Sequence, residues 1–179
     1  KYAITKRKHP PGQFTWGRGK LSKYGIQFRE KQKAKRFYGI LERQFQNYFS
    51  KAERQKGNTG ENLFGMLERR IDNVVYLLSF AASRKNARQV VRHGHIRVNN
   101  KKVDMPSFLV KVGDIIKSDD CETSQNLIKA SIELVKGRSV PAWIEFRPDS
   151  NEGIVIKLPD RDDISISVQE QLIVELCSK

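Results

Sequence analysis

The fold is decided by residues 68–98, which read ERRIDNVVYLLSFAASRKNARQVVRHGHIRV. Apolar side chains recur at helical spacing in the first third, and a second helix is predicted over 84–93, with Ser83 as its N-cap. Residues 96–103 then alternate as in a β-hairpin, with the Asn99-Asn100 pair supplying the positive φ angles of the turn. The stretch therefore predicts two short helices that lead into strands.

The elements on either side follow from the same two periods. Apolar and aromatic residues recur every three to four positions from Ser22 to about Lys56, which predicts a helical segment. Residues 56–60 break it, and Thr59 is expected to cap the next helix, whose apolar face runs from Leu63 to Leu78. Downstream we expect a strand over 110–117, a helix over 125–136 ended by Gly137, a hairpin of 143–147 and 154–158, and a last helix whose capping box is Ser167 with Glu170.

Positive charge is concentrated near the start of the chain. The net charge is +14, and residues 1–36 hold twelve Lys and Arg against a single acid, Glu30. A field of this size needs a polyanion to neutralise it, and the usual one is nucleic-acid phosphate. The last third carries an excess of acids, expected to face solvent or a basic protein: Asp119, Asp120, Asp160, Asp162 and Asp163.

Two cationic features suit RNA in particular. Residues 1–21 read as an extended arm, because prolines and glycines oppose helix, and three aromatic residues stand among its cations, as in surfaces that stack on bases. The alternative is a solvated tail. Arg84, Arg88 and Arg92 recur at i, i+4 and i+8, which predicts a stripe that faces RNA or, alternatively, a solvated helix face.

Catalytic and metal sites are not indicated. Cys121 and Cys177 have no metal-ligand spacing, which suggests a reducing compartment. No run approaches the roughly 20 apolar residues that cross a bilayer, and no apolar signal segment is seen. His93-Gly94-His95 is an incomplete ligand set. Arg70-Ile71-Asp72 resembles the catalytic Asp motif of some pseudouridine synthases, but Asp72 is expected to lie in a helix and either pair with a nearby Arg or orient a helix terminus.

The central stretch closely resembles the RNA-binding domain named after small-subunit ribosomal protein S-four. The residues that carry the resemblance are Glu68–Tyr76, Arg84, Ala87–Val91, His93–Ile96, Val98-Asn99, Val103, Pro106-Ser107 and Gly113-Asp114. The flanks extend it to the S-four protein family itself, through Pro10–Gln13, Tyr24-Gly25, Glu30–Lys33, Tyr38-Gly39, Glu42–Phe45, Gly57–Glu61 and 171–179. The resemblance thus covers almost the whole chain.

The expected fold class is α+β: a helical basic N-terminal region plus a compact two-helix and β-hairpin RNA-binding module, with a C-terminal β-hairpin and helix. Four segments are expected. They are a basic extended arm (1–21), a helical rRNA-binding region (22–67), an S-four-type RNA-binding module (68–130), and a C-terminal helix, hairpin and helix packing back on the helical region (131–179).

The resemblance implies a structural constituent of the small ribosomal subunit. Such proteins bind small-subunit rRNA at a multi-helix junction of the 5′ domain, nucleate assembly and support translational accuracy with protein five. The expected partners are rRNA, protein five and other neighbouring proteins, and mRNA near the path by which it enters; no membrane is expected. The implied location is cytoplasmic, in the ribosome, with an organellar ribosome left open. The alternatives are a free RNA-binding module in ribosome maturation or rescue and an RNA-modifying enzyme; length and flanks favour neither, so no enzyme is expected.

The chain departs from the family pattern at its N-terminal side. Many members carry a zinc site of four cysteines, the last just before the Pro-Pro-Gly-Gln element. Here Tyr2 and its neighbours offer no Cys, so no cofactor is expected. Leu77 also stands where an Arg is common, which removes one possible phosphate contact, and Asn100 stands where the hairpin turn usually has Gly.

The residues expected to contact RNA combine the cations of the arm and helices with the residues that match the family motifs. They are Lys6, Arg7, Lys8, Gln13, Arg18, Lys20, Lys23, Tyr24, Arg29, Lys31, Lys33, Lys35, Arg36, Arg43, Lys56, Asn58, Arg69, Arg70, Asn73, Arg84, Lys85, Arg88, Gln89, Arg92, His93, His95, Arg97, Asn99 and Lys101. No catalytic and no metal-binding residue is expected.

Overall fold

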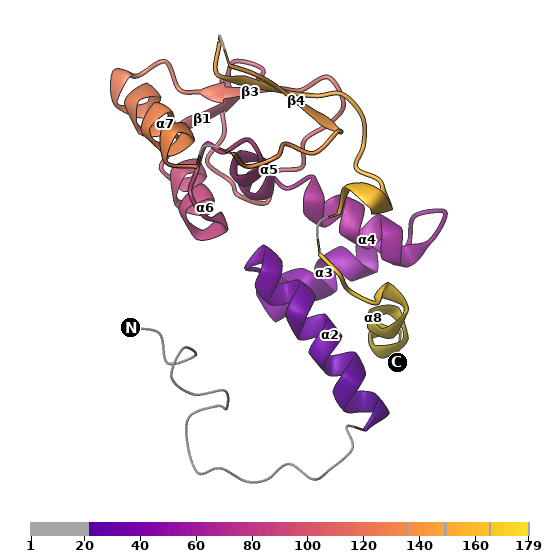
Figure 1. Cartoon of the computed structure of the whole chain (residues 1–179). Helices are drawn as coiled ribbons and strands as arrows, with labels where there is room; N and C mark the ends of the chain where they lie inside the picture. Colours follow the sequence, from indigo (N-terminus) through magenta and orange to yellow (C-terminus); the bar gives the residue numbers. More distant parts are fainter. Residues whose placement is uncertain (1–21, 136, 149, 165, 179) are drawn as a thin grey trace, which may run out of the picture.

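The computed structural model describes residues 22–135, 137–148, 150–164 and 166–178, and the predicted arm 1–21 lies outside them. The described residues form two lobes, one built of helices and one built around a sheet (Figure 1). Each lobe has its own hydrophobic core: residues of 34–67 and 164–173 form one, and residues of 71–155 the other. The predicted α+β class is confirmed.

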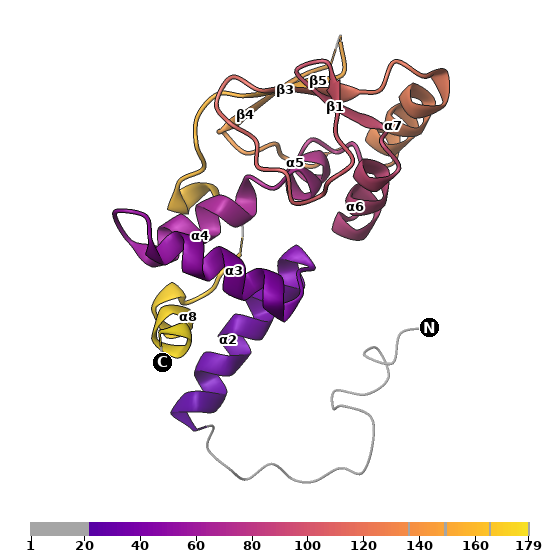
Figure 2. The same cartoon turned by 180° about the vertical axis from the view of Figure 1, so that it is seen from behind.

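The helical lobe joins the two ends of the described chain. Its elements are α2 (Lys23–Tyr38), α3 (Glu42–Glu53), α4 (Thr59–Glu68), the short 3-10 turn η1 (Arg161–Asp163) and α8 (Glu170–Cys177). Aromatic side chains of α3, such as Phe45 and Phe49, fill its core together with Leu63 and Leu67 of α4. Helix α8 returns from the C-terminal side and lies beside α2 and α4 (Figures 1 and 2).

Two boundaries of the helical lobe differ from the sequence-based expectation. The helical segment 22–56 is divided, because Gly39 adopts φ 65° and ends α2, and α3 starts after Leu41. The predicted cap Thr59 is wrong by one position. Asn58 caps α4, and its Oδ1 accepts a hydrogen bond from the backbone N–H of Gly60 at 2.9 Å.

The sheet lobe places helices against one face of an antiparallel sheet. Its elements are α5 (Ile71–Leu77), α6 (Arg84–Arg92), β1 (Ile96–Val98), β2 (Lys101–Lys102), β3 (Ile115–Ser118), α7 (Glu122–Leu134), β4 (Ile144–Arg147) and β5 (Glu152–Val155). The strand order is β2-β1-β3-β5-β4, with every pairing antiparallel. Inward side chains of the sheet, among them Val98 and Ile116, pack with Val74 and Val90 of the helices.

Several local predictions for this lobe are confirmed. The Ser83 hydroxyl caps α6 by accepting from the N–H of Asn86 at 3.2 Å. Asn99 and Asn100 form the hairpin turn with φ 49° and 65°.

Two predicted elements of this lobe have other bounds. The strand predicted over 110–117 starts only at Ile115, because Gly113 makes a turn at φ 87°. The helix predicted from Leu63 to Leu78 is broken into α4 and α5 at Arg69-Arg70, where the chain passes between the lobes.

The C-terminal segment 131–179 is divided between the lobes. Its hairpin does not pack on the helical region, because β5 pairs with β3 and extends the sheet. Gly153 permits this: a Cβ there would lie 2.4 Å from Cδ1 of Leu78, so only glycine lets the strand approach α5. Helix α8 does return to the helical lobe, as expected.

The predicted capping box of Ser167 and Glu170 is wrong. Gln169 precedes α8 without a side-chain cap, and the Glu170 carboxylate pairs with Arg161 instead. A reciprocal capping box occurs earlier, between Asp160 and Asp163 around η1. The start of α8 is thus held to η1 by the Arg161–Glu170 ion pair rather than by the hydroxyl that the sequence suggested.

Candidate RNA-binding surface

Helix α6 presents a polar outer face because its other face is buried. Ala87, Val90 and Val91 enter the core of the sheet lobe. On the outer side, the side chains of Lys85, Gln89, Arg92 and His93 are exposed. No acid occurs in α6, so no carboxylate of the same helix competes with phosphate for its cations. His95 lies behind it, where its Nδ1 is 2.8 Å from the Ser124 hydroxyl.

Aspartate side chains form ion pairs and hydrogen bonds with the hairpin that follows α6. Arg97 pairs with Asp119 at 2.5 Å and with Asp120 at 3.1 Å, and the hydrogen bond to Arg97 lowers the pKa of Asp119. Asn99 donates to Asp114 Oδ1 at 2.8 Å, and its own Oδ1 accepts from the N–H of Ile115. Lys101 is exposed at the tip. Arg97 and Asn99 thus have partners within the protein, whereas Lys101 is exposed and forms no side-chain bond within the described residues.

Helix α2 divides its cations between the protein and solvent. Lys31 and Lys35 both donate to Glu42 of α3, at 2.8 and 2.7 Å, and these hydrogen bonds lower the pKa of Glu42 to about 2. Arg29 and Arg36 are exposed and form no ion pair within the described residues. Their spacing, i and i+7, places them on one side of the helix.

Helix α3 carries a cationic stripe that the residue-by-residue prediction captured only at Arg43. Arg43, Asn47, Lys51 and Arg54 are exposed at i, i+4, i+8 and i+11. Beside the stripe runs a groove of about 190 Å³ lined by Gln44, Asn47, Tyr48, Lys51 and Ser107, the last from the sheet lobe. The spacing is present in the sequence, but the aromatic residues of the same helix give the stronger period there.

Besides Lys31, two further predicted RNA contacts lie inside the protein. Arg70 is 1% exposed; it donates to Asp72 at 2.6 and 3.0 Å and to the Tyr48 hydroxyl at 2.9 Å. Burial lowers the pKa of Arg70, but the hydrogen bonds to Asp72 outweigh this and the pKa is raised. Asn73 is also buried and donates to Glu68. The expected Arg pairing of Asp72 is confirmed, and Arg70 and Asn73 are assigned to the interior.

The predicted stripe Arg84–Arg88–Arg92 does not form one outward row. The guanidinium of Arg84 lies 3.9 Å from the ring centre of Phe37 and 4.2 Å from that of Tyr76. Arg88 donates to the backbone oxygen of Gly39 at 2.9 Å. Arg92 alone is exposed without a described partner. Helical spacing placed the three residues on one side correctly, but the helical lobe packs against the first two.

The remaining predicted contacts are distributed over both lobes. Tyr24 is 63% exposed at the start of α2, and Lys23 lies 3.6 Å from Glu175. Lys33 donates to the backbone oxygen of Ser167. Lys56 and Asn58 lie in the α3–α4 loop, and Arg69 donates to Val110 O at 2.9 Å. Six predicted contacts lie outside the described residues: Lys6, Arg7, Lys8, Gln13, Arg18 and Lys20.

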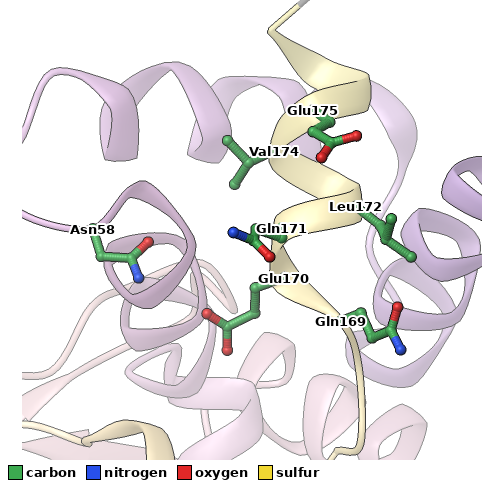
Figure 3. A pocket seen from close by; sticks show the side chains of 7 residues that line it. All are labelled: Asn58, Gln169, Glu170, Gln171, Leu172, Val174 and Glu175. Carbon is green, nitrogen blue, oxygen red and sulfur yellow. The ribbon is translucent and has the colours of Figure 1, made fainter.

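A second, acidic site lies beside α8. A pocket of about 480 Å³ is lined by Asn58, Gln169, Glu170, Gln171, Leu172, Val174 and Glu175 (Figure 3). Burial raises the pKa of Glu170, and Glu175 accepts a hydrogen bond from Gln27 of α2 at 2.7 Å. Its lining holds carboxylates, amides and two aliphatic side chains, so it suits a basic protein segment rather than phosphate.

Residues 22–135, 137–148, 150–164 and 166–178 contain no group of three or more His, Cys, Asp or Glu side chains placed to hold a metal ion. Among the same residues, no helix is long and apolar enough to span a membrane. His93 and His95 lie with their rings 6.0 Å apart and form no ligand set with a third side chain.

Comparison with known proteins divides the chain close to the boundary between the helical lobe and the sheet lobe. Two family models match: the ribosomal protein S4/S9 N-terminal domain over residues 1–68 and the S4 domain over residues 69–116. The small ribosomal subunit protein uS4 of Thermodesulfovibrio yellowstonii is 53% identical over the whole of this chain, which covers 86% of that relative. Proteins of the same name from Thermoanaerobacter sp. strain X514 and Geobacter sulfurreducens are 55% and 51% identical over the same shares.

Proposed function

The chain belongs to the family of the small ribosomal subunit protein uS4, and from that premise we propose that it binds small-subunit rRNA at a multi-helix junction of the 5′ domain. Its role is structural rather than enzymatic, within the ribosome in the cytoplasm. We further propose that this binding nucleates assembly of the subunit.

The observation that carries the proposal is the set of exposed cations without internal partners. Arg29 and Arg36 on α2, Lys51 on α3 and Arg92 on α6 all lack an ion pair within the described residues. By contrast, Lys31 and Lys35 on α2 both form an ion pair with Glu42. Because unpaired guanidinium and ammonium groups release counterions when they meet phosphate, these residues favour RNA over a protein partner.

The test is the salt dependence of binding to an rRNA fragment that contains the junction. The affinity is expected to fall with salt on a log–log slope of several units. The double variant Arg29→Gln and Arg36→Gln should reduce that slope by up to about two. Lys129→Gln, an exposed cation of α7, is the control and should leave the slope within about half a unit of the original. A slope near zero for the unaltered protein would refute the proposal.

We propose small-subunit protein five as the neighbour of the helical lobe, with an influence on decoding accuracy. The pocket beside α8 supports this. Its carboxylates, Glu170 and Glu175, are paired with Arg161 and Lys23, and the rest of its lining is amide and aliphatic, which suits a protein surface rather than phosphate. Glu175→Gln should weaken binding of purified protein five, whereas Glu133→Gln on α7 should not. Equal affinity of both variants for protein five would argue for another contact surface. On the same resemblance, we propose that mRNA passes near this protein where it enters the subunit.

We also propose that RNA binding needs no metal cofactor. His95 Nδ1 lies 2.8 Å from the Ser124 hydroxyl, and within the described residues neither His95 nor His93 belongs to a group of three metal-binding side chains. Full-length protein treated with a chelator should bind the rRNA fragment with unchanged affinity, measured in parallel with metal analysis. About one zinc per chain, together with loss of binding on chelation, would contradict the proposal.

A further inference from the structure

The two lobes meet at a joint built around one arginine. Arg84 starts α6 of the sheet lobe, and its guanidinium lies between the rings of Phe37 from α2 and Tyr76 from α5, at 3.9 and 4.2 Å from their centres. Phe37 belongs to the helical lobe and Tyr76 to the sheet lobe. A planar cation stacked on both rings therefore bridges two separate cores.

A chain of hydrogen bonds continues the joint. Arg84 Nε donates to Asn73 Oδ1 at 3.0 Å, and Asn73 Nδ2 donates to Glu68 Oε2 at 2.5 Å. On the other carboxylate oxygen, Glu68 accepts from the Tyr38 hydroxyl at 2.7 Å. This series of hydrogen bonds thus connects α6 through α5 and α4 to α2. Glu68, Asn73 and Tyr38 are all buried. Buried networks of this kind fix one arrangement of the elements that share them.

A second contact reinforces the first one helical turn further along α6. Arg88 Nη1 donates to the backbone oxygen of Gly39 at 2.9 Å, at the point where α2 ends. Arg84 and Arg88 of α6 therefore both contact the C-terminal end of α2. The pair has the spacing of an RNA-facing stripe, but its guanidiniums are already occupied.

We infer that Arg84 is a positioning residue, which holds the two lobes at the angle that merges the cations of α2 and α3 with those of α6 into one RNA-binding surface. The inference rests on the proposed function, because it explains how a surface divided between two cores is presented as a unit. If the lobes are held in place before RNA binds, ordering them costs no binding free energy. A freely moving joint would incur that cost at every encounter.

The test combines RNA binding with a distance measurement in the RNA-free protein. Cys121 is exposed in the sheet lobe and Glu53 on α3 is exposed in the helical lobe; spin labels on Cys121 and on Glu53→Cys, in a Cys177→Ala background, report the inter-lobe distance. Arg84→Lys keeps the charge and loses the planar group, and Arg84→Met loses both. Arg92→Met is the matched control, since Arg92 lies two turns along the same helix and is exposed.

Both Arg84 variants are expected to broaden the inter-lobe distance distribution and to weaken rRNA binding by about tenfold, with the log–log salt slope unchanged. Arg92→Met should leave the distances unchanged and reduce the slope by about one. Phe37→Leu, which removes one stacking ring but keeps an apolar side chain, should reproduce the Arg84 phenotype if an Arg84 variant fails to fold.

Three results would overturn the inference. Wild-type behaviour of Arg84→Lys together with a reduced slope for Arg84→Met would mean that Arg84 contacts phosphate directly. An unchanged distance distribution in both variants would mean that the joint is held elsewhere. Broadened distances with unaltered rRNA affinity would mean that the angle does not matter for binding. Failure of the unaltered protein to bind rRNA would refute the proposed function instead, and the RNA-free distances would still report on the joint.

Discussion

The pairing of Glu42 with two lysines makes the stability of the helical lobe depend on pH. A carboxyl whose pKa is lower in the folded state stabilises the fold above its unfolded pKa, and this stabilisation is lost as the pH falls through the folded value. For Glu42 the hydrogen bonds to Lys31 and Lys35 lower the pKa from 4.5 to about 2, so the loss occurs between these values.

We therefore expect Glu42→Gln to lower stability at pH 7 and to flatten the acid limb of the stability curve between pH 4.5 and about 2. The effect should be below ~1 kcal/mol, because the Glu42 side chain is 43% exposed and solvent screens the pair. Urea unfolding at several pH values measures it. A parallel acid limb in variant and parent would show that the pair contributes nothing.

At the residue scale, the sequence predicted one cap and one turn correctly, but it missed the Asn58 cap of α4 and the partners supplied by distant segments. The Ser83 cap and the Asn99-Asn100 turn depend on a few neighbouring residues, and both were predicted correctly. The interior position of Arg70 and the stacking of Arg84 depend on Tyr48 and Phe37, which are distant in sequence. A cation that is buried by another lobe has the same local pattern as one that meets phosphate.

Among the elements, α3 offers the sharpest test of where RNA binds. Its stripe of Arg43, Asn47, Lys51 and Arg54 borders a groove that both lobes line. We expect Lys51→Gln to weaken rRNA binding about fivefold to tenfold and to reduce the log–log salt slope by about one, because one phosphate contact is lost. Filter binding over a salt series measures both quantities.

Glu53 provides the matched control on α3, since it is exposed and carries the opposite charge. Glu53→Gln should leave the slope unchanged or raise the affinity slightly, as one source of phosphate repulsion disappears. Should Lys51→Gln bind like the parent protein at every salt concentration, α3 does not belong to the RNA-binding surface.

Helix and strand types were predictable from periodicity, but their ends and their grouping were not. The break at Gly39 was missed because apolar spacing continues across it, and the break at Arg69-Arg70 because Leu67 and Ile71 keep the helical period. Assignment of the last hairpin to the sheet required knowing that Gly153 lets β5 approach Leu78. Such contacts between distant segments leave little trace in a single sequence.

At the scale of the whole molecule, the two separate cores predict a selective loss of stability. Ile173 of α8 is fully buried in the core of the helical lobe. Ile173→Ala should destabilise that lobe by ~2–5 kcal/mol through lost burial and the cavity left behind. Hydrogen exchange is expected to accelerate in α2, α3 and α4 while the amides of β1, β3 and β5 stay protected.

Leu172→Ala, one residue earlier and only half-buried, serves as the control and should change the exchange rates little. Uniform acceleration in both lobes after Ile173→Ala would mean that the molecule unfolds as one cooperative unit.

The return of α8 to the first helices also sets the order in which the chain reaches its folded state during synthesis. Every residue of the sheet-lobe core, 71–155, is translated before α8, so that lobe closes as soon as β5 has left the exit tunnel. The core of the helical lobe is completed only later, because Ile173 of α8 belongs to the same core as Phe45, Phe49 and Leu63. During synthesis the helical lobe therefore keeps part of its apolar core exposed until α8 emerges, and in that interval chaperones have access to it.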